Sequence, residues 1–350
     1  MKLTLKSAAL TALVATAAQS AFAQEVTLRF QHFVSPKSAN PTYFMQPWAD
    51  KIESDSDGRI KVELYPLMQL GGKATTQYDL IRDGVIDGGW VIPSYQPGRF
   101  PEAEALELPF MVTKKGEEAS TAAWIYTQKH LMDDFADVKV IAAHMHGPGL
   151  VHKKGAAISE VADFDGLKLR GPSRPATLLL KKLGANPIGM AVPAFPEALS
   201  KGVLDGGVIT WEMSPSLKLD ELTDSHTDVA GDKSLYNLYF LWAMNKDVYE
   251  GLPDDLKAVI DANSGYATSA LAGRAHDTGD IVGKQSMADA GNEIAEISAE
   301  QTDLIKALGS EVVEEWIEEV TEKGLDGAAL VSDARAAVQL TEGTAAPIEE

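Results

Sequence analysis

The sequence predicts an α/β protein with two lobes, each built on a mixed, mainly parallel sheet with flanking helices. Patterns typical of strands alternate with patterns typical of helices from residue 25 to residue 92, and the alternation begins again at residue 138. A strand-like segment at residues 235–245 follows the second series and is expected to return to the first sheet. With 350 residues, the chain is long enough for two domains of ordinary size.

The first series of elements is strand, helix, strand, helix, strand. Apolar and polar residues alternate in the first two strands, whereas the third is a nearly continuous apolar run that is typical of a buried strand. The helices carry apolar residues at helical spacing, and each is followed closely by a glycine. The predicted strands lie at residues 25–32, 60–65 and 85–92, and the predicted helices at residues 43–54 and 75–83.

The second series begins after a helical middle piece, with a strand at residues 138–146. Further strands are predicted at residues 168–170 and 208–211, and helices at residues 176–183 and 193–200. Residues 253–338 are mostly amphipathic helix. The predicted division assigns residues 24–147 and about 235–275 to lobe I, residues 148–234 and about 276–340 to lobe II, and residues 341–350 to a flexible tail.

The first 23 residues have the pattern of a secretory signal peptide. Lys2 and Lys6 supply positive charge, residues 8–18 are small and apolar, and Ala21-Phe22-Ala23 is a cleavage site of the A-x-A type. The apolar run is shorter than the roughly 20 residues that a membrane-spanning helix needs. We therefore expect cleavage after Ala23 and export to the periplasm. The absence of cysteine is consistent with this, because a chain of this size needs no disulfides.

The composition argues against several functions. The chain carries 51 acidic and 31 basic side chains, so its formal net charge is -20 and nucleic acid would be repelled. There is no G-x-S-x-G elbow, no phosphate-binding glycine loop with a lysine, and no H-E-x-x-H pair. We therefore expect a protein that is not an enzyme and needs no cofactor.

Several motifs occur in an order and at spacings that match one known family. The most specific are residues 163–170 (DFDGLKLR), 183–187 (LGANP) and 197–206 (EALSKGVLDG), and the supporting ones are residues 58–60 (GRI), 69–72 (QLGG) and 107–110 (ELPF). With them, nearly the whole mature chain resembles the solute-binding subunits of tripartite ATP-independent periplasmic (TRAP) transporters, of the dicarboxylate-binding-protein (DctP) type.

The resemblance implies a fold and a function. It implies the two-lobed, type II-like fold of periplasmic binding proteins, with the ligand in a cleft between the lobes. The protein would bind a small organic acid and deliver it to the small and large membrane subunits of the permease, working as a monomer. In this family an arginine at the position of Arg170 grips the ligand carboxylate, and a planar guanidinium suits that role because it donates in pairs. A structural ion pair between the lobes is the alternative for Arg170.

Departures from the family pattern point to the kind of acid. A second arginine, common in the family about twenty positions before Arg170, is replaced here by residues 149–152 (GLVH), and a common asparagine is replaced by the segment that holds Trp211. Fewer polar contacts and an added indole favour a ligand with an aromatic or apolar portion. Trp90 lies at the carboxyl end of a predicted strand, where open sheets bind ligands, and is expected to be a second wall. For both tryptophans the alternative is a place in the hydrophobic core.

Four further residues complete the predicted site. Glu212 follows Trp211, His146 ends a strand and can donate to an organic anion, and Tyr95 and Arg99 lie in the loop after Trp90. The predicted substrate-binding residues are Arg170, Trp211, Trp90, Glu212, His146 and Tyr95, with Arg99 as a weaker candidate at the rim.

Two other ligand classes stay open at this point. Glu212 and the two indoles could receive the cation of a zwitterion such as an ectoine-like or betaine-like solute, while Arg170 holds its acid group. His144 and His146 alternate on one strand and His152 follows closely, so the three imidazoles could instead bind a metal ion in a carrier. No metal is assigned to the main site.

Overall fold

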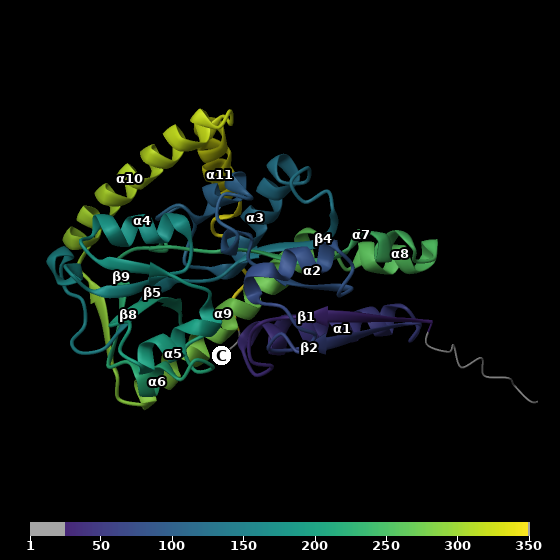
Figure 1. Ribbon diagram of the computed structural model, residues 1–350, viewed down its shortest axis with the longest axis horizontal. Coiled ribbons are helices and arrows are strands. Elements are labelled where there is room, and N and C mark those ends of the chain that lie inside the picture. Colours follow the sequence, from purple (N-terminus) through teal and green to yellow (C-terminus); the bar gives the residue numbers. More distant parts are fainter. Residues whose placement is uncertain (1–24, 349–350) are drawn as a thin grey trace, which may run out of the picture.

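The computed structural model describes residues 25–348. The predicted signal peptide and its cleavage site after Ala23 lie outside the described residues. Within residues 25–348, no helix combines the length and the apolar character needed to cross a membrane. The described chain forms two separate sheets flanked by helices (Figure 1), which confirms the predicted α/β class.

The first sheet has five strands in the order β2-β1-β3-β10-β4. They are β1 (Val26–Gln31), β2 (Ile60–Tyr65), β3 (Gly88–Val91), β4 (Val138–Met145) and β10 (Tyr239–Asn245). Strand β1 is parallel to both of its neighbours, whereas β10 is antiparallel to β3 and β4. The expected return of residues 235–245 to the first sheet is confirmed for residues 239–245. The start of β10 and the ends of β3 and β4 therefore lie at the same edge.

The second sheet has six strands in the order β11-β9-β5-β8-β6-β7. They are β5 (Gly149–Lys153), β6 (Lys168–Gly171), β7 (Asn186–Gly189), β8 (Gly206–Thr210), β9 (Ser225–Val229) and β11 (Glu293–Ile297). Strand β5 is antiparallel to β8 and β9, and the other pairs are parallel. The sequence predicted β6 and β8 but not β7, β9 or β11.

Helices cover both sheets. They are α1 (Gln46–Asp55), α2 (Gln77–Arg82), α3 (Gly116–His130), α4 (Arg174–Lys182), α5 (Phe195–Ser200), α6 (Leu219–Leu222), α7 (Lys246–Glu250), α8 (Asp254–Ala262), α9 (Tyr266–Asp289), α10 (Ala299–Glu322) and α11 (Gly327–Thr341). Helix α10 packs on α4, and α11 packs on α3 (Figure 1). Thr341, in the last turn of α11, donates to the Glu118 carbonyl of α3 at 2.9 Å. The exact lobe boundaries stay a prediction.

Helix α9 packs against elements of both sheets. It contacts α3 and β4 on one side and approaches the segment that follows β8 on the other. The closest approach is at Gly283, where an added Cβ atom would lie 1.9 Å from the Trp211 carbonyl oxygen. At Gly279 it would lie 2.7 Å from the Glu212 Cβ atom. Glycine is required at Gly283 because backbone atoms occupy the space, and at Gly279 because the Cβ atoms of Ala39 and Glu212, which cannot rotate away, occupy it.

We expect Gly283→Ala to destabilise the protein by about 1–3 kcal/mol, the usual range for overpacking. Alanine is the better helix former, so without the close approach the same change would stabilise α9. Denaturant unfolding of both proteins measures the difference. Gly189→Ala is the matched control, since an added Cβ atom there meets nothing within 4 Å. A midpoint raised by Gly283→Ala would contradict the packing argument.

Candidate functional site

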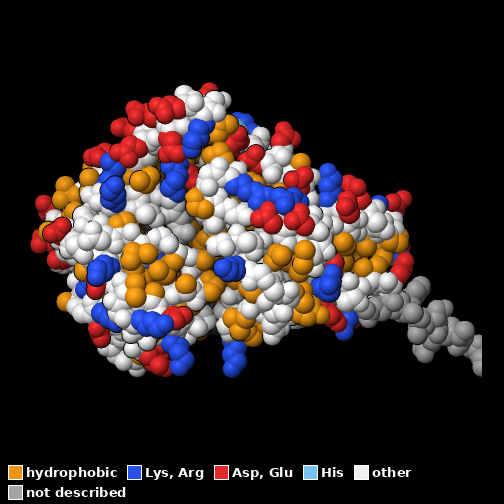
Figure 2. Space-filling model, in the orientation of Figure 1, with side chains coloured by type: hydrophobic (Ala, Val, Ile, Leu, Met, Phe, Trp, Pro, Cys, Tyr) orange, Lys and Arg blue, Asp and Glu red, His pale blue; other side chains and the backbone are white. Residues whose placement is uncertain are grey.

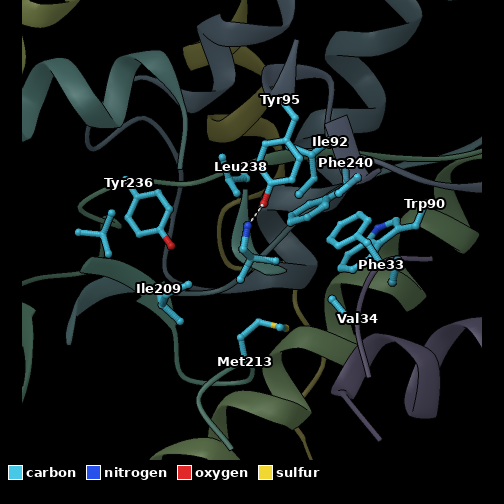
Figure 3. Packing of buried hydrophobic residues seen from close by; sticks show 14 of the residues in the cluster. Phe33, Val34, Trp90, Ile92, Tyr95, Ile209, Met213, Tyr236, Leu238 and Phe240 are labelled. Atoms are coloured by element: carbon cyan, nitrogen blue, oxygen red, sulfur yellow. Dashed lines mark hydrogen bonds between the residues drawn. The ribbon is translucent and has the colours of Figure 1, made fainter. Parts of the chain in front are cut away.

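A cavity lies between the two sheets, at the edge where β3, β4 and β10 of the first sheet face β6 and β8 of the second. The open space inside it is small, with about 30 Å³ available to the centres of water-sized molecules. Strands from both sheets bring apolar and aromatic side chains toward this space (Figure 3). The lining residues are Phe33, Val34, Trp90, Ile92, Tyr95, His146, Arg170, Val192, Ile209, Thr210, Glu212, Met213, Tyr236, Leu238 and Phe240. Of the six residues predicted for the site, all except Trp211 line it.

Arg170 is a buried cation without a carboxylate partner. It lies in β6 and is only 1% exposed. Its Nε donates to the Met190 carbonyl at 3.0 Å and its Nη1 to the Val208 carbonyl at 3.0 Å. Within residues 25–348, no ion pair includes this guanidinium. The alternative of a structural ion pair therefore has no partner in the described chain, and the cavity contains a positive charge that an anion can neutralise.

Tyr95 adds a second donor next to Arg170. Its hydroxyl oxygen accepts a hydrogen bond from the Val192 amide at 3.0 Å (Figure 3) and a longer one from Arg170 Nη2 at 3.4 Å. Burial raises the pKa of Tyr95, so the phenol keeps its proton. Because the oxygen already accepts twice, this proton is available to a ligand. Arg170 and Tyr95 together therefore offer donors that match a carboxylate.

Stacked rings form one wall of the cavity. Trp90 stacks with Phe33 at a centroid distance of 4.9 Å and with Phe240 at 4.8 Å. The Trp90 Nε1 donates to His144 Nε2 at 2.8 Å, so the polar atom of the indole has a partner. The wall is thus apolar and aromatic, and suits an aromatic ring. Neither Phe33 nor Phe240 was among the predicted site residues, because neither belongs to a motif.

Tyr236 also lines the cavity and was not predicted. Its ring packs edge-on against His146 at 5.1 Å, and its hydroxyl points toward the middle of the cluster (Figure 3). Burial raises the pKa of this phenol as well. Tyr236 lies in the segment predicted as a strand from residue 235, but β10 begins only at Tyr239, and the loop before it brings the Tyr236 ring to the site.

A chain of hydrogen bonds connects Trp90 to Glu212 across the junction of the sheets. Since His144 Nε2 accepts from Trp90, His144 Nδ1 carries the proton and donates to His276 Nε2 at 3.3 Å. His276 Nδ1 then donates to Glu212 Oε1 at 3.1 Å. Burial lowers the pKa of His144 well below its usual value, in keeping with a neutral ring. His276, on α9, is the member of this chain that the sequence did not predict.

Trp211 does not reach the cavity. Its indole packs edge-on against His152 at 5.6 Å and lies 5.6 Å from His226, on the other side of the β8 end. Strand β8 ends at Thr210, and Ser214 donates back to the Trp211 carbonyl at 3.0 Å, so the alternation of the strand does not extend to residue 211. Placing Trp211 as a ligand wall is corrected accordingly.

Arg99 is also held away from the site. Its Nη1 donates to Asp79 at 2.7 Å, and its guanidinium lies over the Tyr78 ring. It is a paired surface cation of the first lobe.

The alternative metal site of His144, His146 and His152 does not assemble. His152 Nδ1 lies 2.7 Å from His226 Nδ1 in the second sheet, whereas His144 contacts Trp90 and His276. In the described part of the chain, no group of three metal-binding side chains has a suitable arrangement. The histidines instead pair with one another and with aromatic rings.

The protein surface does not attract anions by its net charge. Acidic side chains gather on the outer face over α10 (Figure 2), and the chain as a whole is strongly acidic. An anionic ligand must therefore be held by local charge, and among the cavity-lining residues Arg170 is the basic one.

Comparisons with known proteins agree with this geometry. The model of bacterial extracellular solute-binding protein family 7 matches residues 30–319. A TRAP solute-binding protein from Rhodoferax ferrireducens, solved with copurified benzoate, is 43% identical with a TM-score of 0.89, covering 91% of this chain and 99% of that one.

Two further structures are similar. A marine metagenome TRAP solute-binding protein specific for aromatic acid ligands, solved with 3-hydroxybenzoate, is 44% identical with a TM-score of 0.89, covering 91% of this chain and 99% of that one. A TRAP periplasmic solute-binding protein from Bordetella bronchiseptica with bound (R)- and (S)-mandelate is 28% identical with a TM-score of 0.81, covering 90% and 99%.

Proposed function

The chain belongs to bacterial extracellular solute-binding protein family 7, the solute-binding subunits of TRAP transporters, and from this membership we propose that it is the receptor for an aromatic carboxylate. One observation carries the proposal: Arg170 is buried without a carboxylate partner beside a wall of stacked rings. The benzoate, 3-hydroxybenzoate and mandelate bound by similar proteins support the same class of ligand.

Arg170 and Tyr95 hold the carboxylate, and the ring lies against Phe33, Trp90 and Phe240. Neutralising Arg170 offsets the cost of burying its charge, while the ring removes apolar surface from water. Contacts from both sheets favour the state in which the lobes are closed on the ligand.

The family consists of solute receptors that act outside the cytoplasm and is not an enzyme family. We propose accordingly that the protein performs no chemistry on the acid and delivers it, as a monomer, to the small and large membrane subunits of the permease. The signal-peptide pattern of residues 1–23 supports export to the periplasm.

Thermal unfolding of the purified protein tests the ligand class. A ligand at a hundred times its Kd adds about 2.7 kcal/mol to the free energy of unfolding. We expect benzoate and phenylacetate to raise the midpoint, and benzamide, methyl benzoate and succinate to leave it in place.

The remaining compounds of the panel address the alternatives. A shift with ectoine or a betaine and none with benzoate would assign the cavity to zwitterions. A shift with Zn²⁺ and none with any acid would restore the metal carrier. Either result would overturn the aromatic-acid proposal.

A further inference from the structure

One atom of the cavity lining is fixed as a hydrogen-bond acceptor by its surroundings. His146 Nδ1 lies 2.8 Å from the Gly147 carbonyl oxygen, which can only accept, so Nδ1 carries the ring proton. Burial lowers the pKa of His146 to about 3, and the ring is neutral. The buried Nε2 therefore presents a lone pair, and no described residue donates to it. The sequence suggested that His146 donates a hydrogen bond to an organic anion. In this arrangement its free ring nitrogen can only accept one.

Glu212 supplies a second acceptor. Its Oε1 accepts from His276 at 3.1 Å and from the Thr210 hydroxyl at 3.2 Å, whereas its buried Oε2 has no donor within residues 25–348. Asp280 lies close by and accepts from the Glu212 amide at 2.9 Å. Burial, followed by the nearby Glu212 carboxylate, raises the pKa of Asp280 well above its usual value, so Asp280 keeps its proton.

Neither acceptor can bind the ligand carboxylate, because lone pairs would face lone pairs. The donors for that group are Arg170 and Tyr95. Both acceptors lie near His276, which contacts Glu212 Oε1 at 3.1 Å and whose ring centroid is 6.4 Å from that of His146. Left unpaired in a complex, two buried acceptors would weaken binding, so the ligand is expected to bring its own donor.

The surroundings favour a neutral donor. The Tyr236 ring packs on His146, and Phe240 lies 6.2 Å from it, so apolar rings surround the acceptor. The Oε1 atom of Glu212 already has two donors. A hydroxyl group on an aromatic ring satisfies a lone pair without adding a second charge to the cavity.

We propose that the solute is a hydroxylated aromatic acid, whose hydroxyl proton is donated to His146 Nε2 or Glu212 Oε2 while Arg170 holds its carboxylate. This inference rests on the proposed function and adds the substituent that the site selects. His146 and Glu212 are then the residues that determine specificity.

Calorimetric titration of benzoate, its three hydroxy isomers and the matching methoxy compounds tests the proposal. We expect at least one hydroxybenzoate to bind roughly 10- to 100-fold more tightly than benzoate, and its methoxy counterpart to lose this gain, because it has no proton to donate. This series uses the unaltered protein and does not depend on any variant folding.

Variants then locate the acceptor. The affinity ratio of hydroxybenzoate to benzoate should fall toward one in His146→Phe, in Glu212→Gln or in both. Glu197→Gln, on the exposed surface of α5, is the matched control and should keep the full ratio. A ratio that persists in both cavity variants would overturn the assignment.

The outcomes separate this inference from the proposed function. If benzoate binds as tightly as every hydroxy isomer, the receptor proposal stands and the hydroxyl proposal fails. Tighter binding of 3-(aminomethyl)benzoate than of any hydroxybenzoate would replace the hydroxyl with a cation and also overturn it. If no aromatic acid binds, the proposed function itself fails.

Discussion

Replacing Arg170 with methionine is expected to weaken binding of an aromatic acid by roughly 30- to 4,000-fold. Removing one partner of a buried, hydrogen-bonded charge pair costs about 2–5 kcal/mol, and each 1.4 kcal/mol is a factor of ten in Kd. The loss of affinity should lie near the upper end of this range because, among the described residues, no other arginine or lysine lines the cavity to replace the lost cation. Calorimetric titration with benzoate measures the change.

A second variant of Arg170 separates the effect of its charge on binding from the effect of its planar shape. Arg170→Lys keeps a cation but loses the planar pair of donors, so an intermediate affinity is expected. Arg99→Met is the matched control, since Arg99 is paired with Asp79 outside the cavity. Circular dichroism and a cooperative unfolding curve establish that Arg170→Met is folded. Native affinity in that variant would exclude Arg170 as the carboxylate anchor.

The sequence predicted the centre of the site because chemistry and position coincide there. Arg170 ends a strand within the DFDGLKLR motif, and Trp90 and His146 lie at or just beyond the ends of two other strands. Ends of strands meet at one edge of a sheet, so residues distant in the chain could be grouped without a structure. Side-chain packing decides which other residues complete the lining of the cavity. The sequence does not show this packing, so Phe33 and Tyr236 were missed.

Trp211 shows where strand periodicity fails. Ile209 lines the cavity, and in a strand continued by one residue past Thr210, residue 211 would lie on the same face as Ile209. The turn that starts at Trp211 is stabilised by a local hydrogen bond from Ser214, and it redirects the indole toward His152. The length of a strand depends on its partners, which a pattern of apolar residues does not contain.

Long-range pairing also explains the missed strands. Strand β11 has the sequence EIAEI within a long helical region, and it forms by pairing with β9, nearly 70 positions earlier, from Glu293 with Ser225 to Ile297 with Val229. The same holds for His276, which lies 132 positions from His144 and meets it through the packing of α9. Such contacts become visible only when the chain is folded.

Glu107→Gln is expected to stabilise the protein increasingly as the pH rises from 5 to 8. Glu107 ends the 3-10 helix Pro101–Glu107 and is 1% exposed; its Oε1 accepts from the Tyr239 amide at 2.9 Å, and the Ser94 and Ser173 hydroxyls also interact with its carboxyl group. Burial raises its pKa from 4.5 to about 8. The folded protein therefore keeps this carboxyl neutral across the range in which the unfolded chain has already lost the proton.

The sign follows from proton binding in the two states. Because the folded state binds the Glu107 proton more tightly than the unfolded chain does, this group contributes its full stabilisation below pH 4.5. That contribution to the free energy of unfolding is lost as the pH rises toward 8. Glutamine keeps the acceptor and cannot ionise, so its advantage grows by about 1.4 kcal/mol per pH unit over this window. Denaturant unfolding of both proteins at pH 5, 6, 7 and 8 measures it, with exposed Glu197→Gln as the control.

Ionisation of Glu107 should also affect the ligand cavity. The Tyr239 amide that Glu107 holds lies between Leu238 and Phe240, which both line the cavity. A negative charge forming at Glu107 would therefore disturb the start of β10 beside the aromatic wall, and the unaltered protein should lose affinity for aromatic acids above pH 8 while Glu107→Gln retains it. Parallel stability profiles for the two proteins would show that Glu107 is ionised throughout and would contradict both expectations.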